Sequence, residues 1–233
     1  MQDGAGSHRS IRSYVLREGR LTPAQAEALE RLWPRYGLDE PAAAFDLDTV
    51  FGRRAPHVLE IGFGNGENLL ARAAAAPGTD FIGIEVHRPG VGYLLRTLEA
   101  QALANVRVAC HDAVEVLGQW LPPACLDELV LYFPDPWPKK RHHKRRIVQP
   151  EFAALVASRL KPGGVWRLAT DWENYAGHMR EVLDAVQGLE NTAADGDWAP
   201  RPESRPLTRF ERRGERLGHA VFDLCYRRCS ASE

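Results

Sequence analysis

Acidic side chains stand at the ends of three successive apolar segments of the sequence. Glu60 lies in HVLEIG, Glu85 ends DFIGIE, and Asp112 comes shortly after VRVAC. The loop after Glu60 also holds three glycines, which are Gly62, Gly64 and Gly66. Glycine lets the backbone turn sharply and approach a ligand closely. Acids and glycines in this arrangement predict a ligand site whose wall carries hydrogen-bond acceptors.

The spacing of the glycines bears on the kind of ligand. G-x-G-x-G departs from the dinucleotide fingerprint G-x-G-x-x-G, and an acid inside the first segment suits a cationic group better than a pyrophosphate. The pattern therefore favours S-adenosylmethionine over NAD. Glu85 falls about where the ribose-binding acid of such folds lies, and Asp112 is placed to accept from an adenine amino group. For each acid taken alone, the alternative is a solvated cap at a strand end.

A fourth apolar segment, DELVLYF, ends in the stretch PDPWP, which holds Asp135. Proline fixes φ at about −65° and restricts the residue before it, so Pro134, Pro136 and Pro138 present this carboxylate on a stiff loop. A stiff acid beside a cofactor is a candidate catalytic residue. Trp137 is either a stacking platform for a base or a buried side chain.

Eight consecutive basic residues, the basic segment, follow at positions 139 to 146. They include six of the thirty Lys and Arg residues of a chain whose formal net charge is −1, so local clustering and not overall charge indicates a nucleic-acid partner. Adjacent like charges repel each other unless a polyanion neutralises them. The residues expected on RNA are Lys139, Lys140, Arg141, His142, His143 and Lys144. A solvated run of charges is the alternative.

Apolar segments alternate with helical ones from residue 56 onward. This alternation is typical of an α/β fold with a mostly parallel, Rossmann-like sheet and helices on both faces. Helices are expected over residues 67–76, 89–103, 150–160 and 174–186, with a KPGG turn at 161–164. Residues 188–206 are expected to form a loop, and 207–228 a C-terminal antiparallel hairpin at one sheet edge.

The N-terminal part has a different pattern. Residues 1–20 predict a flexible basic arm with little to bury. Thr22 as N-cap, Pro23 at the first helical position and Gln25 as the other half of a capping box predict a lead-in helix to about Trp33, followed by a linker to residue 55. Residues 56–233 are expected to form the main domain.

Several other classes are disfavoured by the composition. The cysteines at positions 110, 125, 225 and 229 form no C-x-x-C pair, so a zinc site is not expected. The N-terminus has no apolar core of signal-peptide type, and no stretch approaches about 18 apolar residues. We expect a cytoplasmic protein with reduced thiols, no metal and no membrane contact.

Seven motifs together resemble those of the bacterial tRNA (guanine-N7-)-methyltransferases, a class I S-adenosylmethionine-dependent family with a Rossmann-like sheet. They are EIGFGNGE (60–67), GIEVH (83–87), HDAVEVL (111–117), YFPDPWPKKRHHKRR (132–146), KPGG (161–164), TDW (170–172) and TRFERRG (208–214). The resemblance spans about residues 57–228, and the proline-rich stretch is close to diagnostic.

The resemblance implies transfer of a methyl group from S-adenosylmethionine to N7 of a guanine in the variable loop of tRNA. The implied donor contacts are Glu60, Glu85, Asp112 and Asp135, with Asp135 also catalytic. The implied substrate contacts are Lys139, Asp171, Thr208, Arg209, Phe210 and Glu211, with the basic segment on RNA. Alternatively, Asp171 caps the following helix and Glu211 pairs with Arg212 or Arg213. A monomer or weak homodimer is expected.

Two other functions share part of this pattern. A methyltransferase of the same fold that acts on a small molecule or a protein predicts no RNA dependence, which fits poorly with the basic segment. A non-catalytic RNA-binding protein has no need of the glycine loop or the strand-end acids.

Guanine N7 has an in-plane lone pair and no proton, so its methylation needs no general base and positioning is expected to dominate.

Overall fold

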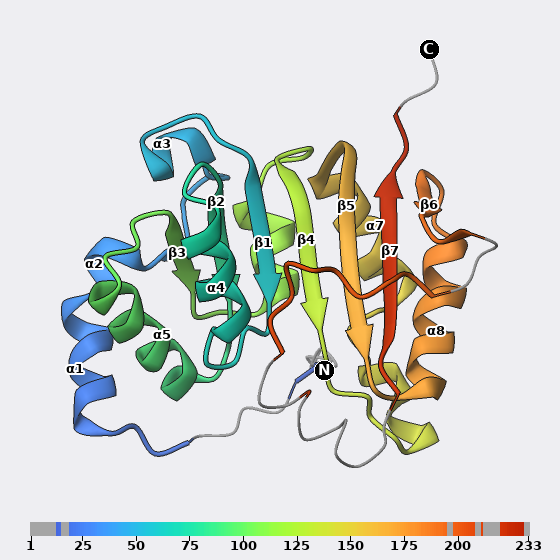
Figure 1. The fold of residues 1–233 in the computed structure, drawn as a ribbon, viewed down its shortest axis with the longest axis horizontal. Helices are drawn as coiled ribbons and strands as arrows, with labels where there is room; N and C mark the ends of the chain where they lie inside the picture. The colour runs from blue at the N-terminus through green and yellow to red at the C-terminus, as the bar shows by residue number, and fades with distance from the viewer. Residues whose placement is uncertain (1–12, 15–18, 195–197, 208–210, 212–219, 231–233) are drawn as a thin grey trace, which may run out of the picture.

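The computed structural model describes residues 13–14, 19–194, 198–207, 211 and 220–230. Within them, seven strands form one sheet in the order β3-β2-β1-β4-β5-β7-β6 (Figure 1). The strands are β1 (His57–Ile61), β2 (Asp80–Ile84), β3 (Val106–Ala109), β4 (Leu126–Tyr132), β5 (Leu160–Thr170), β6 (Leu189–Asn191) and β7 (Phe222–Arg228). Strands β1 to β5 pair in parallel, whereas β7 runs antiparallel to β5 and β6.

Helices cover both faces of this sheet. One face carries α1 (Pro23–Arg31), α2 (Trp33–Tyr36), α4 (Glu67–Ala75) and α5 (Arg88–Ala100). The other carries α3 (Leu47–Phe51), α6 (Ala113–Glu115), the π-helix η1 (Val116–Trp120), α7 (Pro150–Arg159) and α8 (Glu173–Asp184). The predicted Rossmann-like fold, mostly parallel with helices on both faces, is confirmed.

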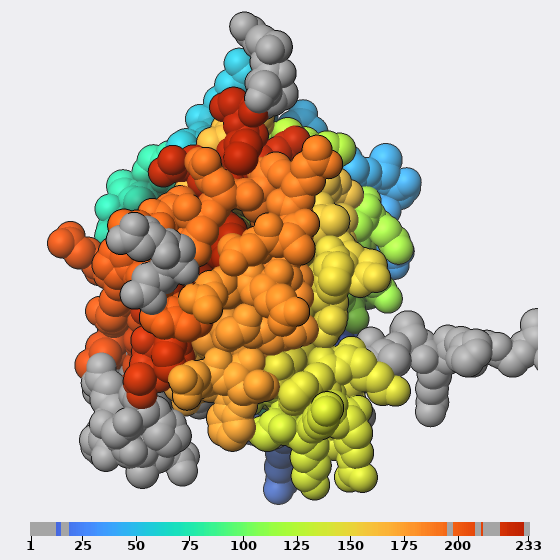
Figure 2. Space-filling model, turned by 90° about the vertical axis from the view of Figure 1, so that its right-hand side faces the viewer, coloured from blue at the N-terminus to red at the C-terminus, as the bar shows by residue number. Residues whose placement is uncertain are grey.

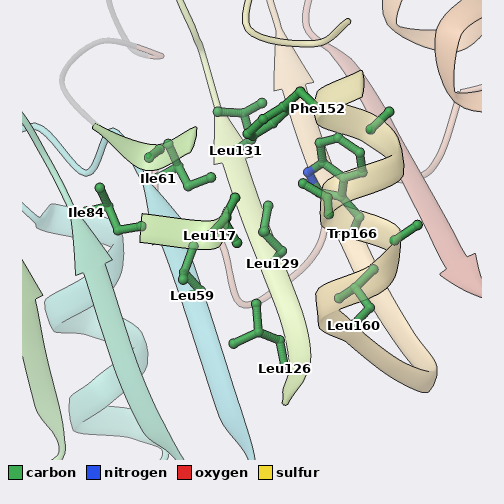
Figure 3. Packing of buried hydrophobic residues seen from close by; sticks show 14 of the residues in the cluster. Leu59, Ile61, Ile84, Leu117, Leu126, Leu129, Leu131, Phe152, Leu160 and Trp166 are labelled. Carbon is green, nitrogen blue, oxygen red and sulfur yellow. The ribbon is translucent and has the colours of Figure 1, made fainter. Parts of the chain in front are cut away.

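Two apolar cores hold the layers together, one on each face of the sheet. Alternate residues of the strands point to opposite faces, so Leu59 joins the core under α7 while its neighbour Val58 joins the core under α4 and α5. Figure 3 shows the first core, in which Leu129 and Trp166 of adjacent strands lie near Phe152 of α7. These side chains fix the strand ends that carry the polar residues of the site.

The lead-in helix begins as its sequence predicts. The Thr22 hydroxyl accepts from the backbone N–H of Gln25, and the Gln25 side chain accepts from the backbone N–H of Thr22, which completes the capping box. Helix α1 packs against α5, and Arg31 forms a two-pronged ion pair with Glu99 across that contact. The predicted basic arm, residues 1–20, lies largely outside the described residues.

Several expected boundaries are wrong. The KPGG stretch is part of a strand and is not a turn between elements, because β5 begins at Leu160 and includes it. The pairing of β5 with β4 shifts in register here, between Leu126 and Glu128. Strand β6 lies inside the expected loop 188–206. The antiparallel hairpin at the edge is therefore made by β6 and β7, while most of the expected first strand, including 208–210 and 212–219, lies outside the described residues.

The strand order reverses between β1 and β4. Open α/β sheets bind ligands outside the carboxyl ends of the strands at such a switch point. These ends share the lower edge of the sheet in Figure 1, where the glycine loop leaves β1 and the proline-rich loop leaves β4. The fold therefore brings the two most informative motifs of the sequence to one place.

Candidate active site

A cavity of about 400 Å³ opens at this carboxyl edge. Its wall holds Gly62 after β1, Glu85 after β2, His111 after β3 and Asp135 after β4. A second cavity, of about 330 Å³, shares Gly62 with the first and is lined by Glu60. Both volumes fall within the range of small-molecule sites, roughly 300 to 1,000 Å³. Predicted site residues from three different strands thus line neighbouring cavities.

Glu85 holds the glycine loop against the end of β2. Its Oε2 accepts from the backbone N–H of Gly64 at 2.8 Å, and its Oε1 accepts from those of Val86 and His87 at 2.7 and 2.9 Å. A carboxylate offers about four acceptor sites, so Glu85 has room for one more donor. This acid is therefore both a loop anchor and a cavity wall, a double role that the sequence pattern does not reveal.

The glycines of the loop serve two purposes. Gly62 and Gly64 have φ of 72° and 59°, and a Cβ added to either would meet no atom within 4 Å. Gly66, at φ 81°, is the N-cap of α4, and an added Cβ would lie 2.6 Å from Leu94 Cδ1 of α5. The first two leave the backbone open to the cavities, whereas the third is needed for helix packing.

Glu60 is a buried acid with a shifted titration. It is 5% exposed, and Asn68 Nδ2 donates to its Oε2 at 2.7 Å. Burial raises the pKa of Glu60 to about 7, although the hydrogen bond from Asn68 and the charge of Arg72 lower it. The other polar side-chain atom of Asn68, Oδ1, is buried and has no hydrogen-bond partner among the described residues. The second cavity therefore presents a carboxyl group and an unpaired acceptor oxygen.

The Asp112 side chain forms a hydrogen bond with the start of the helix that follows it, α6. Its Oδ1 accepts from the backbone N–H of Val114 at 2.8 Å and so caps α6. The residues on either side, His111 and Ala113, line the first cavity. The cap interpretation therefore holds for one carboxylate oxygen, and a donor contact by Asp112 stays a prediction.

The loop that carries Asp135 is strained on both sides. Phe133 and Trp137 have φ of 50° and 45°, values that side-chain-bearing residues rarely adopt. Such strain, about 1 to 3 kcal/mol per residue, collects at functional sites where the surrounding structure enforces it. The backbone N–H of Phe133 donates to Ala169 O at 2.8 Å, which fixes the loop against the end of β5. Asp135 is exposed at the cavity wall, as a catalytic candidate must be.

Trp137 is not an open stacking platform. The Arg145 guanidinium lies 4.1 Å from its ring centroid, and the His142 ring meets it edge-on at 5.9 Å. Its Nε1 donates to the backbone oxygen of Ser13 at 3.1 Å. Neighbouring groups therefore already contact the half-buried indole. This arrangement agrees better with a buried side chain than with a platform for base stacking.

The basic segment includes the 3-10 helix η2 (Lys140–Arg145). Lys139, Lys140, Arg141 and Lys144 are exposed, and His142 and His143 are half-buried. Figure 2 shows the yellow-green part of the chain that contains η2 protruding at the lower edge of the molecule. The predicted RNA-contacting lysines and arginine are therefore free to meet a large partner.

Arg146 departs from the expectation that the whole basic segment faces RNA. It is 2% exposed, its Nε donates to Pro136 O at 2.9 Å, and its Nη2 donates to Asn174 Oδ1 at 2.8 Å. Because the guanidinium satisfies buried and neighbouring acceptors, it cannot reach a phosphate. It instead ties the Asp135 loop to the start of α8.

The structure bears on the alternative interpretations of two predicted substrate residues, while their contact with substrate stays a prediction. Asp171 is half-buried and does not occupy the N-cap of α8, which is Trp172. Glu211 is 2% exposed, and its Oε1 lies 3.0 Å from Arg205 Nη2 and 3.4 Å from Arg201 Nε. Thr208, Arg209 and Phe210 lie outside the described residues, as do Arg212 and Arg213.

Sequence reasoning missed Arg205 and Asn68. The Arg205 side chain is fully buried, forms a two-pronged ion pair with Asp223 at 2.5 and 3.0 Å, and lines the second cavity together with Asn68. Neither residue belongs to one of the seven motifs recognised in the sequence. The position of Arg205 in the site depends on its ion pair with Asp223 of β7, which no local sequence pattern indicates.

Comparison with known proteins places the chain. A family model described as "Putative methyltransferase" matches residues 54–224. The tRNA (guanine-N(7)-)-methyltransferase of Methylococcus capsulatus is 60% identical over 220 residues, which is 94% of this chain and 95% of that protein. The protein of the same name from Alkalilimnicola ehrlichii is 58% identical over 228 residues, 97% of this chain and 96% of that protein. The chain belongs to the tRNA (guanine-N(7)-)-methyltransferase family.

Solved structures add the fold of this family member but not its reaction. The 16S rRNA methyltransferase KamB has a TM-score of 0.60 at 15% identity, covering 84% of this chain and 99% of that chain. The [4+2]-cyclase SpnF has a TM-score of 0.53 at 16% identity, covering 92% and 100%. Because these two proteins are named for different reactions, the fold alone does not decide the activity.

The described residues of this methyltransferase-family chain also bear on membrane and metal binding. Among them, no helix combines the length and apolarity needed to cross a membrane. The same residues contain no group of three or more His, Cys, Asp or Glu side chains arranged to hold a metal ion.

Proposed function

We propose that this protein transfers the methyl group of S-adenosylmethionine to N7 of a guanine in tRNA. The observation that carries the proposal is the convergence of the glycine loop and the strained Asp135 loop on one cavity at the switch point of the sheet. The high identity to curated tRNA (guanine-N(7)-)-methyltransferases supports the choice of substrate and of acceptor atom.

The chemistry of the cavity wall fits S-adenosylmethionine. A donor of this kind carries a sulfonium and an ammonium group, and Glu60 with the unpaired Oδ1 of Asn68 offers acceptors for a cationic end. Glu85 has an acceptor position left for sugar hydroxyls. Gly62 and Gly64 let a ligand approach the backbone without a Cβ in the way. Asp112 is proposed to accept from the adenine.

The protein's contribution to the chemistry is positioning and charge stabilisation. The bound donor supplies an electrophilic methyl group, and N7 attacks it with its own lone pair, so no residue has to remove a proton first. Holding the two reactants in line is worth roughly 7 to 11 kcal/mol for well-oriented pairs. Asp135 is proposed to stabilise the positive charge that the purine gains, or to hold the base by a donor edge.

On the RNA side, exposed cations of the basic segment are proposed to bind phosphates. Lys139, Lys140, Arg141 and Lys144 are exposed at the edge that holds Asp135, which supports this assignment. His142, His143, Asp171, Thr208, Arg209, Phe210 and Glu211 complete the proposed substrate residues. Glu211, held by Arg201 and Arg205, is proposed to shape the wall of the site.

The remaining sequence expectations are part of the same proposal. The arm at residues 1–20, the lead-in region 21–55 and the methyltransferase domain 56–233 describe the proposed organisation. A tRNA substrate fits a cytoplasmic protein. The expected monomer or weak homodimer stays a prediction, as does independence from metal.

The direct test is to incubate the purified protein with unmodified tRNA and isotope-labelled S-adenosylmethionine, then to identify the methylated nucleoside by mass spectrometry. We expect labelled 7-methylguanosine, and no label in RNA when the protein is omitted. Donor binding by calorimetry without any methylated nucleoside would instead favour a methyltransferase that acts on a small molecule or a protein.

A further inference from the structure

Trp172 is an exposed aromatic residue at the carboxyl edge of the sheet, and it is not one of the proposed donor or substrate residues. It follows Asp171 and stands at the N-cap of α8, directly after β5 ends. Its side chain belongs to the few large apolar groups of the described residues that remain exposed, at 40%. Trp172 is not among the residues that line the two cavities, but it lies at the carboxyl edge of the sheet onto which they open. Exposed apolar surface at this edge indicates a ligand or partner that covers it.

The backbone of Trp172 is fixed in place. Its N–H donates to the Thr170 hydroxyl at 3.2 Å, and its carbonyl accepts from the N–H groups of Tyr175 and Ala176, both at 2.9 Å. Thr170 itself is only 1% exposed. The residue that carries the exposed indole is therefore anchored on both sides by the end of a strand and the first turn of a helix.

The same region is tied to the candidate catalytic loop. The buried guanidinium of Arg146 donates to Pro136 O, next to Asp135, and to the Asn174 side chain, two residues after Trp172. Figures 1 and 2 agree with this link, because the chain after β4 lies beside the start of α8 in both views. The separation between Asp135 and the Trp172 backbone is thus set by a buried side chain.

Trp172 is also better suited to stack on a base than Trp137. Arg145 and His142 already occupy the ring of Trp137. Within the described part of the chain, no ring or guanidinium covers Trp172. A base displaced from the tRNA would meet the exposed part of the Trp172 side chain beside Asp171, which is a proposed substrate contact.

We propose that Trp172 is the stacking platform for the target guanine and that its ring stabilises the charge the base acquires. This inference rests on the proposed function. As N7 forms its bond to the methyl carbon, the C–S bond breaks, its electron pair stays on sulfur, and the purine becomes a cation. Tryptophan is the best aromatic partner for a cation over its face. Trp172 is therefore a positioning residue whose contribution grows as the methyl group is transferred.

The test compares Trp172→Leu and Trp172→Phe with Tyr93→Leu, which removes a similarly exposed aromatic from α5, at 45% exposure. Because base stacking on an aromatic contributes about 1 to 3 kcal/mol, Trp172→Leu should lower kcat/KM for tRNA by roughly 5- to 140-fold. Trp172→Phe should lose much less, and Tyr93→Leu nearly nothing. Donor affinity and thermal unfolding should match the wild type in all three variants.

A second readout separates stacking from general damage. Trp172→Leu should weaken binding of tRNA that already carries 7-methylguanosine more than binding of unmodified tRNA, because only the methylated base is cationic. Binding is measurable even if no methyl group is transferred, so failure of the proposed function leaves this readout intact. Wild-type kcat/KM in Trp172→Leu, equal losses in Trp172→Leu and Tyr93→Leu, or equal weakening for both tRNAs would overturn the proposal.

Discussion

Glu60 is a buried acid whose charge should depend on what occupies the second cavity. In the folded chain its pKa is about 7, against 4.5 for an exposed glutamate, and burial is the main cause. An acid with a raised pKa contributes stability that is fully present below about pH 4.5 and is lost as the pH rises through about 7. The difference corresponds to roughly 3 kcal/mol. A cation beside Glu60 would reverse this by favouring the carboxylate.

Donor binding should therefore release a proton from Glu60. We expect the affinity for S-adenosylmethionine to rise between about pH 6 and pH 8, because the ionised carboxylate attracts the cationic donor. Calorimetry across this range in buffers of different ionisation enthalpy measures both affinity and proton release. In Glu60→Gln the affinity should be lower at pH 8 and nearly independent of pH. The same slope in Glu60→Gln would assign the titration to another group.

Asp135 is the residue on which turnover should depend most. Asp135→Asn keeps the size of an exposed loop side chain, so the fold should persist, but it removes the charge that is proposed to face the methylated purine. Loss of one preorganised electrostatic contact typically lowers kcat by about 100- to 1,000-fold. Single-turnover methylation at saturating tRNA and donor measures this step. Glu173→Gln, an exposed acid in the first turn of α8, is the matched control and should keep wild-type rates.

A near wild-type rate in Asp135→Asn would remove this residue from the catalytic role. It would leave Asp135 as a structural part of the proline-rich loop.

Local patterns in the sequence predict the acids at the strand ends but not their surroundings. Glu60, Glu85 and Asp135 could be placed because the end of an apolar segment is also the end of a strand. The burial of Arg146 and the ion pairs of Glu211 could not be predicted, because they depend on partners such as Asn174 and Arg205, which only the folded chain brings close. For Asp112 a cap is already the alternative prediction, but its hydrogen-bond partner, the backbone N–H of Val114, could not be read from the sequence.

Among the elements, the glycine loop offers a matched pair of substitutions. Gly62 and Gly52 have nearly the same φ, 72° and 71°, and an added Cβ meets no atom within 4 Å at either position. Gly62 lines both cavities, whereas Gly52 is the C-cap of α3. Alanine at either position should lower the free energy of unfolding by about 1 to 2 kcal/mol, the cost of left-handed backbone for an L-residue.

Only Gly62→Ala should also lose donor affinity, since its methyl group projects into the proposed donor space. Denaturant unfolding and donor calorimetry on both variants check the pair. Equal donor affinities in the two variants would show that the donor does not approach the loop backbone at Gly62.

The basic segment is tested by its dependence on salt. Each neutralised phosphate releases counterions, so log affinity falls with log salt by about 0.7 to 0.9 per contact. Replacing the exposed Lys140, Arg141 and Lys144 by alanine should weaken tRNA binding and flatten this slope by up to roughly two to three. Arg145 and Arg146 are left intact because they contact Trp137 and the Asp135 loop.

The control removes the same charge elsewhere, with alanine at the exposed Arg35, Arg54 and Arg96, all outside the basic segment. Its salt slope should stay close to that of the wild type, as should the donor affinity of both triple variants. An unchanged slope in the Lys140, Arg141 and Lys144 variant would return these residues to the solvated-charge interpretation.

Element boundaries show where sequence patterns reach their limit. The helices after β1, β2 and β4 were predicted within a few residues, because their apolar faces repeat and because proline or a glycine loop marks their starts. The three-residue strand β6 has too few residues to show an alternation. KPGG lies inside β5 at a register shift, because Leu160 pairs with Leu126 of β4 and the pairing resumes at Val165 with Glu128, and its turn-forming composition does not indicate a strand.

At the scale of the molecule, one topological feature gathers the whole site. The reversal of strand order between β1 and β4 leaves an opening at the carboxyl edge, and Glu85 lines it. Strands β2 and β5, after which Glu85 and Trp172 follow, lie on opposite sides of the β1 and β4 pair. The basic segment emerges from the same edge, so a tRNA held there would present a base to a donor in the cavity. We propose that this base is a guanine and that N7 is the acceptor.

The most direct measurement of that claim uses tRNA in which the variable-loop guanosine is replaced by 7-deazaguanosine, which has a C–H group in place of N7. We expect the protein to bind this tRNA with nearly the affinity of the unmodified tRNA but to transfer no labelled methyl group to it, while the unmodified tRNA gains one 7-methylguanosine. Equal methylation of both tRNAs, at whatever nucleoside, would show that N7 of this guanine is not the acceptor.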